Sequence, residues 1–186
     1  MFKQELKIPK ERIAVLIGTK GEIKKKIENK ANVIIDVDSK EGDVIISGED
    51  SFVLYITKDV VSAIGRGFAP KDALKLFQEG CIFDILNITE YVGKSKKGQR
   101  RIRGRVIGSE GKARKMIEDL TDTKIIIYHK TVGIIGEVEK VSIARRAVDM
   151  LLSGAPHGNV YRWLENKIRE IEKRVFEKEH EIKEAS

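Results

Sequence analysis

Residues 107–118 read Ile-Gly-Ser-Glu-Gly-Lys-Ala-Arg-Lys-Met-Ile-Glu, and residues 17–28 read Ile-Gly-Thr-Lys-Gly-Glu-Ile-Lys-Lys-Lys-Ile-Glu. The two stretches lie 90 positions apart (107 − 17), and they agree at six positions, which include both glycines of a Gly-x-x-Gly turn. Apolar residues at helical spacing stand on both sides of each turn. A motif repeated at a fixed offset predicts one structural unit that occurs twice.

The Gly-x-x-Gly turn has a chemistry that suits phosphate. Glycine adopts backbone angles closed to other residues, and it lets another backbone approach closely. The helix that follows the turn presents free N–H groups and a partial positive charge at its start. A single such turn is as readily a helix corner without a ligand. Its duplication, with lysines and arginines after both turns, favours a clamp for a nucleic-acid backbone.

The composition favours two small domains and a polyanionic partner. The chain has 186 residues, of which 41% are hydrophobic, and its net charge is +7 with a pI of about 9.4. It shows no apolar run long enough to cross a membrane, and it does not begin like a secretory signal. The single cysteine, Cys81, excludes an intrachain disulfide. We therefore expect a cytoplasmic protein in a reducing setting.

The positive charge is concentrated around the second turn. Between positions 94 and 115 there are ten basic residues and one acidic residue, Glu110. A solvated basic face is the alternative interpretation, but the overlap with the Gly-x-x-Gly turn favours a phosphate-binding patch.

The sequence carries no pattern typical of catalysis or metal binding. The histidines, His129, His157 and His180, are scattered, and Cys81 stands in an apolar stretch. No metal-ligand spacing, no nucleophile–base constellation and no nucleotide-triphosphate loop is visible. We therefore expect a binding protein without enzyme activity, metal or cofactor.

Periodicity predicts the same element order in both units: strand, helix, Gly-x-x-Gly, helix, two strands and a closing helix. In the first unit these elements are expected at residues 2–8, 11–17, 22–31, 33–37, 44–47 and 51–64, with Asp50 as the cap of the last helix. In the second they are expected at residues 81–88, 100–107, 112–120, 124–128, 132–136 and 139–152, with a polar loop or frayed helix at 91–99. A linking helix is expected at residues 71–78.

A final helix is predicted from about residue 159 to residue 184. Its apolar residues form one stripe at three-four spacing: Leu164, Ile168, Ile171, Val175 and Ile182. We expect this helix to pack across one unit. A partner-binding or coiled-coil arm is the alternative.

The element order and the repeated Ile-Gly-x-x-Gly signature resemble a KH domain of the eukaryotic type (type I), present twice. The basic run at residues 101–108 and the Gly-Ala-Pro-His-Gly segment at 154–158 are similar to the archaeal partner-of-Nob family of small-subunit ribosome assembly factors. The resemblance implies an α+β fold, in which each domain has a three-stranded antiparallel sheet with helices on one face. It divides the chain into a first KH domain (1–66), a linker helix (67–80), a second KH domain (81–153) and a C-terminal helix (154–186).

The resemblance also implies a site. KH domains hold about four unpaired nucleotides in a groove, with the Gly-x-x-Gly turn on the backbone. The implied RNA-binding residues of the first domain are Gly18, Thr19, Lys20, Gly21, Lys24 and Ile35. Those of the second are Arg101, Arg103, Arg105, Gly108, Ser109, Glu110, Gly111, Lys112, Arg114 and Ile126. The apolar groove floor would further include Ile13, Leu16 and Ile17 in the first copy, and Val106 and Ile107 in the second.

The two clamps are unequal in charge. Lys20 fits the preference for a basic residue between the glycines, whereas Glu110 would repel phosphate unless it points away. Because arginines and lysines flank the second turn, we hypothesise that the second domain is the main RNA reader and the first is auxiliary.

The resemblance implies a monomeric protein that binds single-stranded RNA near the 3′ end of small-subunit ribosomal RNA. It also implies a protein partner such as the endonuclease that matures this end. Two alternatives remain open from the sequence: a binder of other nucleic acid, such as a messenger regulator, an exosome-type subunit or a single-strand DNA protein, and an adaptor that docks proteins.

Overall fold

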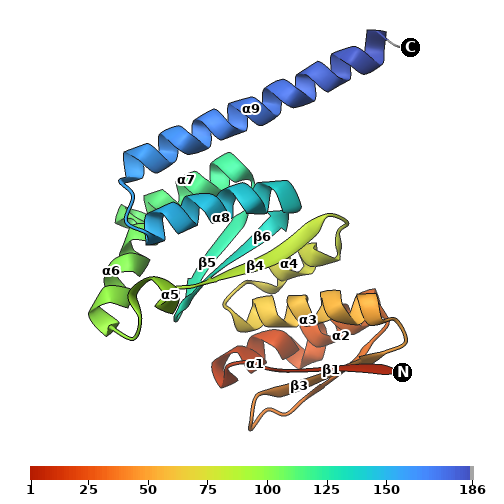
Figure 1. The fold of residues 1–186 in the computed structure, drawn as a ribbon. Coiled ribbons are helices and arrows are strands. Elements are labelled where there is room, and N and C mark those ends of the chain that lie inside the picture. Colours follow the sequence, from red (N-terminus) through yellow and green to blue (C-terminus); the bar gives the residue numbers. More distant parts are fainter. Residues whose placement is uncertain (185–186) are drawn as a thin grey trace.

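The computed structural model describes the backbone of residues 1–184 and the side chains of residues 1–177. Two α+β units follow one another, each built on a three-stranded antiparallel sheet (Figure 1). The strand order is β1-β3-β2 in the first sheet and β4-β6-β5 in the second, so the third strand of each unit lies in the middle. The predicted fold class, α+β with two three-stranded antiparallel sheets and a C-terminal helix, is confirmed.

The first unit follows the predicted element order. Its elements are β1 (Phe2–Lys7), α1 (Lys10–Ile17), α2 (Glu22–Ala31), β2 (Ile34–Val37), β3 (Asp43–Gly48) and α3 (Ser51–Gly65). The predicted cap is confirmed, because the Asp50 carboxylate accepts hydrogen bonds from the backbone N–H groups of Phe52 and Val53 at 2.8 and 3.2 Å. The largest side chains of the core are fully buried between the sheet and the helices: Leu16, Ile27, Ile35, Ile46, Leu54 and Ile64.

The second unit repeats this order with one addition. Its elements are β4 (Cys81–Asn87), α5 (Thr89–Val92), α6 (Lys96–Ile107), α7 (Lys112–Thr121), β5 (Lys124–Tyr128), β6 (Thr131–Glu137) and α8 (Val138–Leu152). The prediction of a loop or frayed helix up to residue 99 was wrong in its second half, because α6 already begins at Lys96. Two contacts explain this early start: Ser95 Oγ caps the N–H of Gly98, and the buried Gln99 amide donates to the carbonyl of Gly93 at 2.8 Å.

The repeated glutamates have a structural reason. Glu28 accepts a hydrogen bond from the backbone N–H of Ile35 at 2.8 Å, and Glu118 accepts one from Ile125 at the same distance. Each carboxylate therefore ties the helix after a Gly-x-x-Gly turn to the edge strand of its sheet. A charged acceptor makes this bond stronger than a neutral one.

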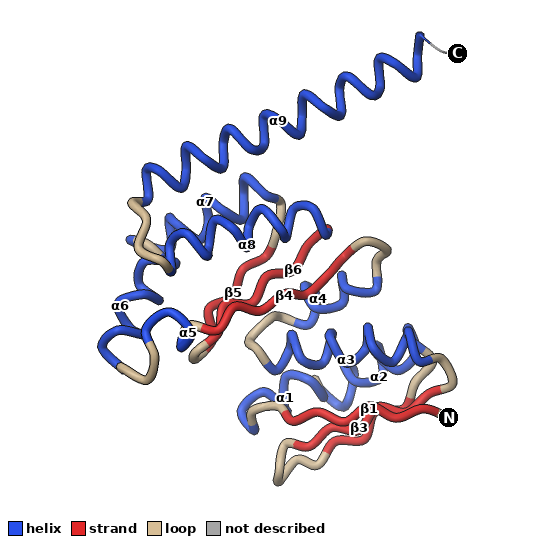
Figure 2. Tube along the Cα trace, in the orientation of Figure 1, coloured by secondary structure: helices blue, strands red, loops and turns tan. Residues whose placement is uncertain are grey.

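The linker is part of the first core. Residues 71–78 form α4 (Pro70–Ala73) and a 3₁₀ turn (Leu74–Phe77) instead of one helix. Phe68, which precedes α4, is fully buried, and its ring meets that of Phe83 on β4 edge to face, with centroids 5.7 Å apart. The second sheet is thus covered on both faces: α7 and α8 lie on one, and α3 and α4 of the first unit on the other (Figure 2).

Helix α9 (His157–Glu184) lies across the second unit, as predicted (Figure 1). Val160 and Leu164 are fully buried, and Ile168 and Ile171 are partly buried against the same core. Val175 is 52% exposed, and the predicted stripe residue Ile182 lies outside the described side chains. The arm interpretation of the far end stays a prediction.

Candidate nucleic-acid interface

The two Gly-x-x-Gly turns have the same backbone conformation. In the first turn φ is 72° at Gly18, 53° at Lys20 and 79° at Gly21. The corresponding angles in the second turn, at residues 108, 110 and 111, are 74°, 53° and 77°. The residue before the last glycine adopts a left-handed conformation that costs a side-chain-bearing residue roughly 1 kcal/mol. The sequence repeat is therefore a repeat of a strained, defined loop.

The two glycines of each turn have different tasks. A Cβ built on Gly108 would lie 2.6 Å from the backbone nitrogen of Ala113, and one on Gly18 would lie 2.5 Å from the Ile23 side chain. The first glycine is needed because α7 or α2 packs against it. By contrast, a Cβ on Gly21 or Gly111 would meet nothing within 4 Å. The last glycine therefore leaves backbone open to an approaching ligand.

Both turns deliver a helix start without a side-chain cap. Neither α2, after Gly21, nor α7, after Gly111, has a side-chain cap, although the first N–H group of each helix, at Glu22 and at Lys112, donates to a carbonyl of its own turn. Free N–H groups at a helix start bind anions, and the helix dipole adds to the attraction. A phosphate fits this position in both units.

The side chains between the glycines are exposed. In the second turn the Glu110 carboxylate lies 3.7 Å from the Lys112 ammonium, and the two side chains are 80% and 77% exposed. An ion pair this exposed is worth little, so it only dampens the repulsion expected between Glu110 and phosphate. Thr19 and Lys20 are likewise exposed in the first turn.

Several cations near the second turn are unpaired within the described part of the chain. Arg101, predicted as an RNA contact, is exposed, and its side chain makes no ion pair or hydrogen bond to any described residue. The same holds for the exposed Lys97, Arg100 and Lys115. These side chains are available for phosphate contacts. Arg103, half-buried, donates from Nη1 to the carbonyl of His129 at 3.3 Å.

Arg105, predicted as an RNA contact, has a structural task. Its guanidinium donates from Nε to the carbonyl of Leu151 at 3.1 Å and from Nη2 to that of Ala155, at the end of α8. The first unit uses another arginine for this, since Arg12 donates to the carbonyls of Ile64 and Phe68, each at 2.8 Å. The end of the last KH helix thus carries an arginine clamp in both units.

Lys24 and Arg114 occupy equivalent positions, and both are engaged. Lys24 Nζ lies 3.3 Å from Glu28, and Arg114 Nε lies 3.6 Å from Glu118. Because these carboxylates also hold the edge strands, the two cations support the fold. Arg114 Nε has no hydrogen-bond partner among the described residues, and its side chain is 40% exposed. The exposed part of the side chain excludes this nitrogen, which is itself buried.

The predicted isoleucine contacts need correction. Ile35 is fully buried in the first core, so its side chain cannot touch RNA. Ile126 points to the opposite side of β5 from Ile125, and it packs on the first core, 3.1 Å from a Cβ built on Gly67. Strand residues alternate between faces, so Ile126 lies on the opposite face from Ile125, which is the equivalent of Ile35 and is also fully buried. Three further floor residues are also buried: Ile13, Leu16 and Val106.

The second turn has an exposed apolar border that the first lacks. Ile107, predicted as part of the groove floor, is 38% exposed, and Met116 on α7 is 40% exposed. The counterparts in the first unit are the half-buried Ile17 and the charged Lys26. Met116 lies within the helix predicted at residues 112–120 but was not among the predicted site residues; the available signal was an apolar residue among charged positions. Apolar surface beside a clamp gives nucleobases a place to pack.

The turn between β5 and β6 of the second unit contacts α1 of the first unit. Tyr128, at the end of β5, donates from its hydroxyl to Glu11 of α1 at 2.6 Å. His129 Nε2 lies 3.4 Å from the same carboxylate. The hydrogen bond from Tyr128 is the largest cause that lowers the pKa of Glu11. The pKa of Tyr128 is raised, mainly by burial and next by the same hydrogen bond. Tyr128 is thus a junction residue.

Reactive groups do not gather in the described part of the chain. His157 Nε2 lies 2.8 Å from the carbonyl of Arg105, and His180 lies outside the described side chains. Burial raises the pKa of the Cys81 thiol, which disfavours a reactive thiolate. No group of three histidine, cysteine, aspartate or glutamate side chains that could hold a metal was found among the described residues. Within the same residues, no helix has the length and apolar character of a membrane span.

Two family models match the chain. The model described as a eukaryotic-type KH domain (KH-domain type I), for the second KH domain of PNO1, matches residues 82–169, and a general KH-domain model matches residues 3–61. A KH domain-containing protein of Methanocaldococcus jannaschii is 44% identical over 176 residues, which is 92% of this chain and 77% of the relative. The pre-rRNA-processing protein PNO1 of Chaetomium thermophilum is 33% identical over 67% of this chain and 48% of its own length.

Solved structures resemble the whole chain. A protein of Aeropyrum pernix superposes with a TM-score of 0.90 at 36% identity, covering 95% of this chain and 96% of that one. Dim2p of Pyrococcus horikoshii, in a complex with a/eIF2α and rRNA, superposes with a TM-score of 0.83 at 43% identity, covering 91% and 96%.

Proposed function

We propose that the protein binds single-stranded ribosomal RNA and acts in small-subunit ribosome assembly, because the chain belongs to the archaeal PNO1-like family of two-KH-domain proteins. The RNA we propose is the region near the 3′ end of the small-subunit RNA. The observation that carries the proposal is the second Gly-x-x-Gly turn, where Gly111 leaves open backbone at an uncapped helix start beside unpartnered cations. A PNO1 relative named for pre-rRNA processing and a structural neighbour in complex with rRNA support the choice of RNA.

In the proposed mechanism, different residues bind the RNA backbone and contact the bases. The open turn and the positive end of α7 hold the sugar-phosphate backbone, which gives affinity without sequence preference. Arg101 and its exposed neighbours add long-range attraction, which falls as salt rises. Ile107 and Met116 border the clamp with apolar surface against which unpaired bases pack. The assigned residues therefore favour an unpaired strand over a duplex, whose bases are not free to pack there.

We propose that the second unit is the main reader and the first an auxiliary one. The second has the exposed apolar border and the longer run of unpartnered cations, whereas the first offers Thr19 and Lys20 between its glycines. A monomer in the cytoplasm with both clamps on one chain suffices for this function. A protein partner, such as the endonuclease that matures the 3′ end, would be positioned by the bound RNA. The chain itself needs no catalytic group for the proposed role.

Paired aspartates in each turn test the ranking. Ser109→Asp with Glu110→Asp adds one negative charge, whereas Thr19→Asp with Lys20→Asp changes the charge by −3 (0 to −1 and +1 to −1). Affinity for a single-stranded RNA that matches the 3′ end is measured by fluorescence anisotropy. We expect the second-turn variant to lose most binding and the first-turn variant to lose less, although charge alone predicts the opposite order. Unchanged affinity of the second-turn variant would overturn the ranking.

Experiments in cells distinguish the proposed function from two alternatives, a regulator of messenger RNA and a protein adaptor. Crosslinking followed by sequencing of the bound RNA should enrich the 3′ end of small-subunit ribosomal RNA; a broad spread over messengers would favour a regulator. If the chain is instead a protein adaptor, its partners should remain bound after nuclease treatment. Such an outcome, with no RNA affinity in vitro, would contradict the proposal.

A further inference from the structure

A cavity of about 580 Å³ lies at the junction of the two units, outside both Gly-x-x-Gly clamps. Its lining comes from the end of α3, the end of β4, the α5–α6 connection and the β5–β6 turn. Three cations line it, Arg66, Lys94 and Lys130, together with the neutral residues Asn87, Thr89, Gly93 and Thr131. No lining residue is acidic.

The three cations are exposed and unpaired among residues 1–177. Their side chains are exposed, and none makes an ion pair or hydrogen bond with any described residue. The carboxylate that approaches the β5–β6 turn, Glu11, is taken up by Tyr128 and His129. Three like charges around one cavity repel one another, which costs stability unless an anion binds there. Of the neutral lining residues, Thr89 and Thr131 donate their hydroxyls to Asn87 Oδ1 and to the carbonyl of Tyr128, so the Asn87 amide N–H groups are the neutral donors that the wall adds.

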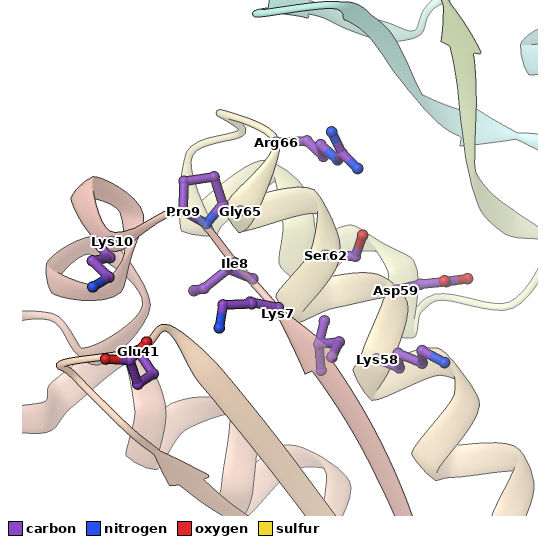
Figure 3. A pocket seen from close by; sticks show the side chains of 11 residues that line it. Lys7, Ile8, Pro9, Lys10, Glu41, Lys58, Asp59, Ser62, Gly65 and Arg66 are labelled. Atoms are coloured by element: carbon purple, nitrogen blue, oxygen red, sulfur yellow. The ribbon is translucent and has the colours of Figure 1, made fainter.

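A neighbouring pocket shows the contrast. The cavity of about 570 Å³ between β1 and α3 also includes Arg66, but its lysines, Lys7, Lys10 and Lys58, are accompanied by the acids Glu41 and Asp59 (Figure 3). Mixed charges of this kind neutralise one another. The charged residues that line the junction cavity are all positive, so this cavity, unlike its neighbour, favours an anion.

The position of the cavity relates it to both clamps. The β5–β6 turn, which supplies Lys130, contacts α1 through the Tyr128–Glu11 hydrogen bond and α6 through the Arg103–His129 hydrogen bond. Helices α1 and α6 are the helices that lead into the two Gly-x-x-Gly turns, and they lie at the same end of the molecule as α5 (Figure 1). Arg66 comes from the first unit and the other two cations from the second, so the cavity exists only because the units are packed together.

We propose that this junction cavity is a phosphate site that holds the backbone of a single-stranded RNA between the two clamps. The inference rests on the proposed function, and it adds a third contact that makes both units read one continuous strand. A strand of about four nucleotides fills one clamp and does not need the cavity. A strand of about twelve nucleotides, three clamp lengths, has backbone left over to cross it.

The test compares two strand lengths in three proteins. The pocket variant is Arg66→Ala with Lys130→Ala. The control, Lys3→Ala with Lys71→Ala, removes the same charge from exposed positions outside both clamps and the cavity. Single-stranded RNAs of about four and about twelve nucleotides are titrated by anisotropy over a range of salt concentrations. Thermal unfolding verifies that all three proteins fold alike, as expected because the substituted side chains make no hydrogen bond or ion pair to a residue whose side chain the structure describes.

We expect the pocket variant to bind the short RNA as the unchanged protein does and to bind the long RNA about tenfold more weakly, about threefold for each exposed cation. Its salt slope for the long RNA should fall by about 0.7 per lost phosphate contact, or about 1.4. The control should show neither change. Equal losses in pocket variant and control, or an equal loss with both RNA lengths, would refute the junction site while leaving the clamps intact. Absence of binding by the unchanged protein to either RNA would refute the proposed function itself.

Discussion

Alanine substitutions at the last glycine of each turn distinguish an effect on stability from an effect on RNA binding. Gly21 and Gly111 have nearly the same backbone, with φ of 79° and 77° and ψ of 15° and 9°, and a Cβ on either would meet nothing within 4 Å. An alanine at either position therefore pays the same left-handed penalty, about 1 kcal/mol, and no clash. For a chain of this length that lowers the melting temperature by about 3 °C. The two variants should be equally destabilised.

Their RNA affinities should differ. At Gly111 the new methyl group projects from the backbone that we assign to the main clamp, and loss of one charge-assisted hydrogen bond there costs about 1.5 kcal/mol, or about tenfold in Kd. At Gly21 the loss should stay within about threefold, because the first clamp is auxiliary. Melting temperature is measured by circular dichroism and Kd by anisotropy with single-stranded RNA. Wild-type affinity of Gly111→Ala, or a larger loss for Gly21→Ala, would refute the reasoning.

Three further predictions concern the groups that hold the fold. Glu118→Gln removes a charged acceptor from β5 and should lower the free energy of unfolding by about 1 to 2 kcal/mol in urea, whereas the exposed Asp119→Asn should not; equal stability would contradict the assigned tie. Burial and the hydrogen bond to Asp149 raise the pKa of Tyr91 to about 12. The protonated Tyr91 hydroxyl therefore stabilises the folded state fully below the unfolded pKa of 10, and this stabilisation is lost as the pH rises toward 12. The stability difference between Tyr91→Phe and wild type should therefore shrink above pH 10, and a constant difference would count against it. Tyr128 lowers the pKa of Glu11 below 4.5, so that contribution is present above pH 4.5 and lost as the pH falls through the lower folded value. Glu11→Gln should remove this acid-dependent part of the stability curve, and an unchanged curve would argue against the junction bond.

The sequence predicted most elements because local signals and the repeat agreed. The Gly-x-x-Gly turns fixed the helix ends at Ile17 and Ile107, and the Asp50 cap fixed the start of α3. The start of α6 was missed because it depends on a local side-chain hydrogen bond, from the buried Gln99 to the carbonyl of Gly93, that a polar sequence does not reveal. Packing of the second sheet on the first unit was also beyond reach, since Phe83 and Ile126 read as ordinary strand residues.

The candidate site was predicted in its backbone and less well in its side chains. Charge pattern alone cannot distinguish a free cation such as Arg101 from Arg105, whose guanidinium is held by two carbonyls at the end of α8. The groove isoleucines failed for a different reason. The repeat offset of 90 pairs Ile35 with Ile125, and both are buried, so choosing Ile126 moved the prediction to the other face of the sheet.

The central claim is that an RNA strand lies on the second turn, and amide chemical shifts test it most directly. A short single-stranded RNA is titrated into isotopically labelled protein, and the N–H signals are followed residue by residue. The account predicts the largest changes at residues 109–113, where the turn meets the open start of α7, and smaller changes at residues 19–23. Large changes confined to the outer face of the first sheet or to α9, with residues 109–113 unaffected, would contradict it.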